Sequence, residues 1–148
     1  MTMEPRYVGP KVFTVDQANR SLPHVKQLLE ALRAQQGTLR TLEQAVVITE
    51  LEGLQHDGIP SRAARVKASA HTVQLGAGVG QLQETLEQLE ALGCQLKDLD
   101  EGLVDFFTVH QGQLVFLCWK DGEPDVRFWH FLAAGFAGRR PITELANN

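Results

Sequence analysis

The sequence predicts an α+β fold, in which a long antiparallel helical hairpin with a coiled-coil-like pattern precedes a small three-stranded antiparallel sheet. Leucines recur every seven residues in two stretches up to residue 96, and apolar runs separated by glycine-containing turns follow. A chain of 148 residues has the size of one ordinary domain. We therefore expect a single domain over residues 1–148, with the hairpin at 12–96 and a β-meander with its tail at 97–148.

The first helix begins with a capping box. Thr14 supplies the N-cap and Gln17 lies three residues further on, so each side chain can bond the backbone N–H of the other. Pro23 lacks an N–H, and we expect the helix to kink or restart there. The apolar residues then form two seams, with Val25, Leu32, Leu39 and Val46 in one and Leu28, Leu42 and Thr49 in the other, where Gln35 is a polar exception.

The second helix follows a turn at residues 53–60, a stretch that contains two glycines and a proline. Ser61 can cap this helix, and Gly93 marks its end. Two helices of similar length joined by a short turn predict an antiparallel hairpin. The seams of the second helix are expected at Leu75, Leu82, Leu89 and Leu96, and at Thr72, Val79 and Leu86.

Three strands are predicted at residues 103–109, 113–119 and 125–132, with turns at Gln111-Gly112 and Asp121-Gly122. The first turn places Asp105 opposite Cys118. A second loop at 120–124 would place Cys118 opposite Val126 and Leu114 opposite His130. Cys118 and His130 would then be roughly 13 Å apart along the sheet, which disfavours a simple Cys/His zinc site.

Acidic residues gather where the first predicted strand begins and the second one ends. Clustered carboxylates repel one another unless a cation or arginines neutralise them. A hard divalent ion such as Mg²⁺, Mn²⁺ or Ca²⁺ is one solution, with Asp105 and Glu123 as ligands together with Asp98 or Asp100. Salt bridges to arginine are a second solution, and solvated surface acids are a third. The acids are Asp98, Asp100, Glu101, Asp105, Asp121 and Glu123, and the arginines are Arg127, Arg139 and Arg140.

Composition restricts the class of protein. The net charge of −4 gives no general electrostatic attraction to nucleic acid or to an anionic membrane, although Arg62, Arg65 and Lys67 form a local basic strip. No apolar run approaches the roughly 20 residues of a membrane span. Cys94 and Cys118 are too few for a disulfide framework, so we expect two unpaired thiols in a reduced cytoplasmic protein. No GxSxG, HExxH or phosphate-loop motif indicates a reaction.

Several short motifs resemble one bacterial family of unknown function, DUF2203. They are Val12-Phe13-Thr14-Val15-Asp16-Gln17-Ala18-Asn19, Leu22-Pro23, Leu96-Lys97-Asp98-Leu99, Gly102-Leu103-Val104-Asp105-Phe106, Leu117-Cys118-Trp119, Gly122-Glu123, Trp129-His130 and Gly135-Phe136-Ala137-Gly138-Arg139. Members usually carry an acidic residue after the Trp-His pair, where this chain has Phe131. The resemblance implies a ligand or metal site among its chemically capable positions, Asp105, Cys118, Glu123, His130 and Arg139.

Two functions of different classes follow from these observations. The first is a non-enzymatic binding module whose leucine-rich helices offer a surface to a second copy of the chain, as a homodimer, or to another protein. The second is a metal-binding protein or small metal-dependent enzyme that uses the acidic end of the sheet. Metal analysis of the purified protein would separate the two.

Overall fold

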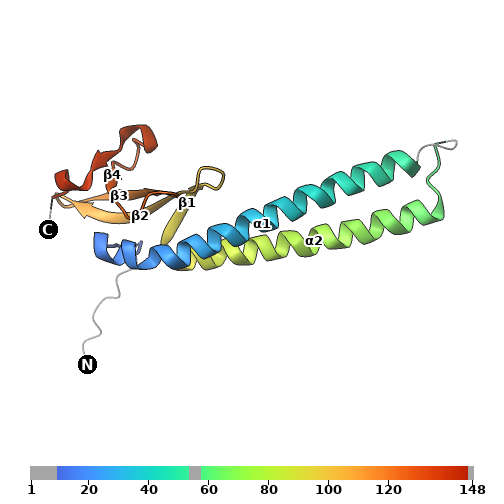
Figure 1. Cartoon of the computed structure of the whole chain (residues 1–148), viewed down its shortest axis with the longest axis horizontal. Helices are drawn as coiled ribbons and strands as arrows, with labels where there is room; N and C mark the ends of the chain where they lie inside the picture. Colours follow the sequence, from blue (N-terminus) through green and yellow to red (C-terminus); the bar gives the residue numbers. More distant parts are fainter. Residues whose placement is uncertain (1–9, 54–57, 147–148) are drawn as a thin grey trace, which may run out of the picture. The chain divides into compact units, whose positions relative to one another are not determined.

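The computed structural model describes residues 10–53 and 58–146 (Figure 1). These residues form two compact units, one containing the sheet, at 10–27 and 89–146, and one containing most of the helical hairpin, at 28–88. The α+β fold with a helical hairpin and an antiparallel sheet is confirmed. Residues 54–57 of the predicted turn lie outside the described part of the chain.

Helix α1 (Val15–Gly53) begins at the predicted capping box. The N–H of Thr14 donates to Gln17 Oε1 at 2.9 Å, and the N–H of Gln17 donates to Thr14 Oγ1 at 3.1 Å. The helix does not restart at Pro23, which lies inside it. Leu22 and Val25 are buried while Pro23 is exposed, so apolar packing on the opposite side offsets the roughly 3 kcal/mol that an internal proline costs.

Helix α2 (Arg62–Ala91) is capped by Ser61, whose hydroxyl oxygen accepts the N–H of Ala64 at 3.1 Å. The helix ends two residues before Gly93, where φ is +98°. A side chain at Gly93 would collide with the side chains of Lys11 and Phe13. Glycine is therefore required here both for the positive φ and for the close packing of these two side chains against the backbone. Leu96 is therefore not part of the helical seam but of a strand.

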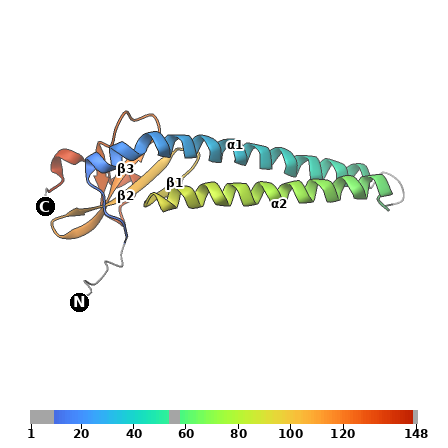
Figure 2. The ribbon, with the colours of Figure 1, turned by 90° about the horizontal axis from the view of Figure 1, so that it is seen from below.

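The two helices run side by side in the hairpin unit (Figures 1 and 2). The predicted seams of α1 and the seam through Leu75 and Leu82 are buried or half-buried. The second predicted seam of α2 is wrong at Thr72 and Val79, which are exposed, while Leu86 is half-buried. Small and polar residues replace it. Gln35 Nε2 donates to Thr85 Oγ1 at 2.9 Å, and a Cβ on Gly78 would lie 2.7 Å from Leu39 Cδ2. The residues of this seam are Ala64, His71, Gly78 and Thr85.

The sheet has five antiparallel strands in sequence order, not three. The two additional strands are short and lie at its edges, where the apolar pattern is weak. The strands are β1 (Cys94–Asp98), β2 (Leu103–His110), β3 (Gln113–Lys120), β4 (Phe128–His130) and β5 (Arg140–Pro141). Short 3-10 turns follow β4 and β5.

The predicted register of β2 against β3 is confirmed, with Asp105 opposite Cys118. Positive φ angles at Gln111 and Gly112 form the tight turn that fixes this register. The predicted register of β3 against β4 is wrong by two residues, because Cys118 faces Phe128 and not Val126. Buried Val126 leaves the ladder, and its N–H donates to Asn19 Oδ1 in α1 at 2.7 Å.

The two faces of the sheet have different coverings. One face carries a continuous apolar core against the start of α1, where the ring of Phe13 meets that of Phe106 edge to face at 5.1 Å. Figure 1 shows the start of α1 on one side of the sheet and the segment after β4 on the other. The core face includes Val104, Phe106, Val115, Leu117, Trp119 and Trp129. No described helix is long and apolar enough to cross a membrane.

Candidate functional site

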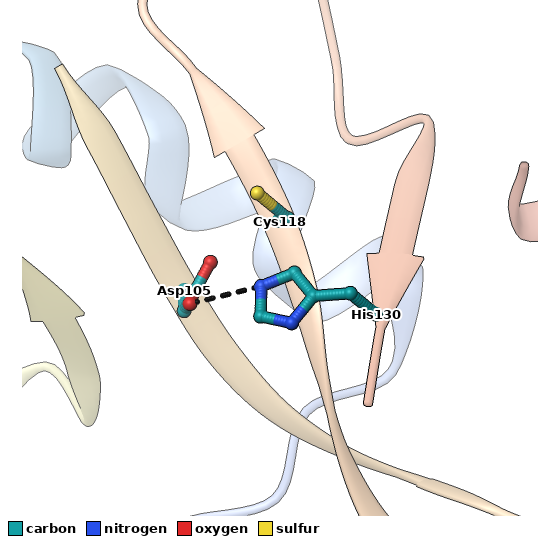
Figure 3. A group of neighbouring side chains, drawn as sticks. All are labelled: Asp105, Cys118 and His130. Carbon is teal, nitrogen blue, oxygen red and sulfur yellow. Dashed lines mark hydrogen bonds and ion pairs between the residues drawn. The ribbon is translucent and has the colours of Figure 1, made fainter. Parts of the chain in front are cut away.

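Three adjacent strands each contribute one polar side chain to the face of the sheet opposite α1. Asp105 on β2 lies directly opposite Cys118 on β3, and His130 on β4 lies opposite Phe116, two residues before Cys118. Because side chains alternate along a strand, the pairing register places all of these residues on one face. Figure 3 shows Asp105, Cys118 and His130 converging from the three strands.

The three side chains form a tight and buried group. His130 Nε2 lies 3.1 Å from Asp105 Oδ2, and one ligand atom from each of the three residues lies within 4.8 Å of the other two. None of the three is more than 3% exposed. The prediction that His130 lies far from Cys118, which disfavoured a site containing both, is therefore wrong. The cause is the two-residue shift of β4.

The hydrogen bond of His130 Nδ1 sets the orientation of its ring. Nδ1 lies 2.7 Å from the carbonyl oxygen of Phe131, and a carbonyl oxygen can only accept, so Nδ1 carries a proton. Nε2 is then the ring nitrogen that faces Asp105 and Cys118, and in the neutral form of the imidazole it is the atom whose lone pair a metal would use. This is the arrangement in which a histidine is ready to ligate a metal through Nε2.

Burial dominates the electrostatics of the group. It raises the pKa of Asp105 above its ordinary value, against the opposing effects of the charge of His130, a hydrogen bond with the Cys118 thiol and the charge of Lys97. Burial, together with the negative charge of Asp105, raises the pKa of Cys118 to about 12, while Arg139 acts in the opposite direction. Asp105 Oδ1 is buried and has no hydrogen-bond partner among the described residues. A carboxylate oxygen in this position lacks the compensation that buried polar atoms usually have.

Glu123 and Arg139 form a second polar group behind Cys118. Arg139 Nη2 donates to Glu123 Oε1 and, at 3.1 Å, to the carbonyl oxygen of Cys118. Its guanidinium carbon lies 4.1 Å and 4.7 Å from the ring centroids of Phe128 and Phe136. The structure thus gives Glu123 the arginine partner that was one of the open alternatives for the acidic cluster.

Two further acids of the cluster, Asp98 and Glu101, also have local partners. Glu123 accepts the N–H of Lys120, Glu101 pairs with the Lys120 ammonium at 3.1 Å, and Asp98 Oδ1 accepts the N–H of Glu101. The hypothesis that Asp105 and Glu123 share one cation with Asp98 or Asp100 stays a prediction. Among the described residues, the group with metal-ligand spacing is Asp105, Cys118 and His130.

A pocket of about 220 Å³ opens over the three side chains. Lys97 belongs to its lining and was missed as a site residue. It occupies an irregularity of β1 between Leu96 and Asp98, where the ladder shifts register. The available signal was its position as the only base in an otherwise acidic stretch. The lining residues are Lys97, Leu103, Asp105, Phe116, Cys118, His130, Leu132, Ala133, Gly135 and Phe136.

Both cysteines are buried and free, which confirms the prediction of unpaired thiols. The thiol of Cys94 lies on β1, outside the three-residue group, and donates to the carbonyl oxygen of Leu89 at 3.3 Å. Burial raises its pKa to about 11. Cys94 therefore offers a matched buried cysteine against which Cys118 can be compared.

The model of a family described as "Uncharacterized conserved protein (DUF2203)" matches residues 11–142, which is most of the chain. No curated protein and no solved structure matches the chain.

Proposed function

The chain belongs to the DUF2203 family, and we propose that it is a metal-binding protein that holds a zinc-like transition-metal ion on Asp105, Cys118 and His130. The observation that carries the proposal is the convergence of three different ligand atoms within 4.8 Å at a buried place. Burying a carboxylate at one place with a thiol and an imidazole is costly unless its charge is compensated, and a metal ion would supply that compensation.

The donor set indicates the kind of metal. A thiolate and an imidazole suit zinc and other borderline transition metals, whereas magnesium and calcium prefer oxygen ligands. Tetrahedral zinc with ligand distances of 2.0–2.3 Å needs ligand atoms about 3.3–3.8 Å apart. That separation lies within the 4.8 Å limit of the group, so small side-chain movements would suffice.

The surroundings of the group also support this proposal. The Phe131 carbonyl oxygen holds the Nδ1 proton of His130, which leaves Nε2 as the ligand atom. A cation would compensate the buried Asp105 carboxylate, whose Oδ1 has no hydrogen-bond partner within the described part of the chain. It would also favour the thiolate of Cys118 over the thiol.

Three protein ligands leave one position of a tetrahedral ion for water or another molecule. Catalytic zinc sites have this arrangement, whereas structural zinc sites use four protein ligands. The pocket over the group gives that fourth position access to a small molecule. The proposal therefore includes a metal-dependent activity without assigning a reaction.

The test is metal affinity measured on matched variants. Protein stripped with a chelator is titrated with zinc against a chromophoric competitor, and with cobalt, whose thiolate bond gives a near-ultraviolet absorption band. Cys118→Ser and His130→Ala are expected to weaken zinc binding by at least about 100-fold and to remove or alter the cobalt band. Cys94→Ser, a buried cysteine outside the group, should bind as the wild type does.

Two results would contradict the assignment. Equal zinc affinities for Cys118→Ser and Cys94→Ser would remove Cys118 from the site. Loss of binding in Glu123→Gln, with binding kept in Cys118→Ser, would favour the alternative site on Asp105 and Glu123 over the group proposed here.

A second function, an interaction module, is supported by apolar side chains on the hairpin. Six large apolar side chains of this unit are more than half exposed: Val47, Ile48, Leu51, Ile59, Val66 and Val73. On α1 the groove beside Val47 and Ile48 also contains Arg40 and Glu43, which a two-fold axis could pair between two copies. We propose a homodimer in which two copies pack through the α1 surface that carries Val47 and Ile48. We also propose that the protein resides in a reducing cytoplasm, where both thiols stay free.

The dimer is tested by light scattering at micromolar concentration. The wild type is expected at twice the 16.4 kDa mass of one chain. The double variant Val47→Glu/Ile48→Glu is expected as a monomer, because charged side chains would be buried at the interface. Val12→Glu, which changes an exposed apolar residue of the sheet unit, should remain dimeric. A wild-type monomer would contradict the proposal.

A further inference from the structure

The pocket beside the proposed metal site is small. Its volume of about 220 Å³ lies below the roughly 300–1,000 Å³ typical of sites for drug-sized ligands. At about 30 Å³ for each water molecule, it corresponds to roughly seven waters. The pocket therefore suits a molecule smaller than a drug-sized ligand.

The walls of the pocket are mainly apolar. Leu103 and Phe116 come from the sheet, and Leu132 and Phe136 come from the segment that follows β4. The group of Asp105, Cys118 and His130 forms the polar part. This combination favours a ligand with an apolar body and one polar head directed at the metal.

Lys97 supplies the one basic side chain of the lining. Its ammonium lies 4.6 Å from the ring centroid of Phe116 and donates to Gln95 Oε1 at 2.8 Å. The contact with the ring of a pocket residue keeps the charge beside the opening. A cation at this position attracts an anionic ligand.

The net charge of the metal-loaded site also favours an anionic ligand. A divalent ion with one carboxylate, one thiolate and a neutral imidazole has no net charge. An anion in the fourth position then adds one negative charge, and the single ammonium of Lys97 balances it. Arg139 and Lys120 also lie over the ring of Phe136, but they pair with Glu123 and Glu101. A second negative charge would therefore lack a partner of its own in this apolar pocket, so a monoanion fits better.

We propose that this pocket binds a small organic monoanion, a carboxylate on an apolar body, with the carboxylate at the fourth position of the metal and Lys97 as its counter-charge. The inference rests on the proposed metal site, and it adds the chemical class of the ligand. Leu132 and Phe136 would contact the apolar body.

The experiment uses the full chain loaded with cobalt, with benzoate as the probe and benzamide as its uncharged counterpart of similar shape. Benzoate is expected to shift the cobalt spectrum in a saturable way and to bind at least about tenfold more tightly than benzamide, because a hydrogen bond to a charged group is worth more than one to a neutral group. Lys97→Met is expected to weaken benzoate binding about tenfold, and Lys97→Arg is expected to retain most of it.

Two controls separate the parts of the inference. Lys26→Met removes a lysine that also lies over an aromatic ring, that of Trp119, but outside the pocket, and it should bind benzoate normally. Leu132→Trp would fill the pocket, so it should lose benzoate while it retains the cobalt band.

The outcomes distinguish the two proposals. Failure of the wild type to bind cobalt contradicts the metal site itself. A wild type that binds cobalt but shows no benzoate-dependent change, or a Lys97→Met variant that binds benzoate as the wild type does, overturns the monoanion pocket and leaves the metal site standing.

Discussion

Replacement of Arg139 by alanine is expected to lower the free energy of unfolding by about 3 kcal/mol, the lower end of the range for breaking a buried ion pair. Arg139 and Glu123 keep only 12% and 20% of their side-chain surface exposed. Without Arg139, the Glu123 carboxylate keeps the Lys120 N–H as its partner but loses its counter-charge. The Cys118 carbonyl oxygen and the rings of Phe128 and Phe136 lose a contact as well.

Urea denaturation of matched variants measures this effect. Arg127→Ala removes an ion pair with Asp125 in which both side chains are at least half exposed, and it should change stability by no more than about 0.5 kcal/mol. Arg139→Lys should fall between the two, because lysine keeps the charge but loses the planar fork. If Arg139→Ala costs no more than Arg127→Ala, the buried pair does not stabilise the fold.

Zinc is expected to stabilise the wild-type protein by about 4 kcal/mol when the free metal exceeds its Kd a thousandfold. The reason is that the three ligands meet only in the folded chain, since Asp105, Cys118 and His130 lie on three different strands. Denaturation with zinc and with excess chelator gives the difference. Weak binding of the metal to the unfolded chain would reduce the value but not its sign.

The matched cysteine variants again provide the comparison. Cys94→Ser should show the full stabilisation by zinc, and Cys118→Ser should show less than about 1 kcal/mol of it. Stabilisation of equal size in both variants would place the metal elsewhere in the chain.

Local signals were sufficient to predict the relative position of two of the three site residues. The turn at Gln111-Gly112 fixes the register of β2 against β3, so the pairing of Asp105 with Cys118 follows from the sequence alone. The position of His130 does not follow. Val126 leaves the ladder just before β4 and donates its N–H to Asn19, and no pattern near β4 shows that a residue 107 positions earlier accepts this N–H.

The helical hairpin could also be predicted only in part from the sequence. Leucine spacing predicts the seams of α1 and the leucine-rich seam of α2, because large apolar residues are the signal that periodicity detects. The other seam of α2 contains Gly78, which accommodates Leu39, and Thr85, which bonds Gln35. Small or polar residues of this kind give no hydrophobic signal in the sequence. They can be recognised as seam residues only once the facing residues of the other helix are known.

The bond from Asn19 to Val126 couples helix α1 to the chemistry of the sheet. Asn19 lies in the second turn of α1, and the N–H that it holds belongs to the connection that sets where β4 pairs with β3. If β4 slid by two residues so that His130 faced Leu114, it would carry His130 about 7 Å further along the sheet from Cys118. If Asp105, Cys118 and His130 hold a metal as proposed, metal binding and the packing of the start of α1 would be linked reciprocally: a change that weakens the packing of this helix would weaken metal binding, and metal binding would stabilise the helix by the same free energy. A helix that contributes no ligand would then influence the affinity of the site.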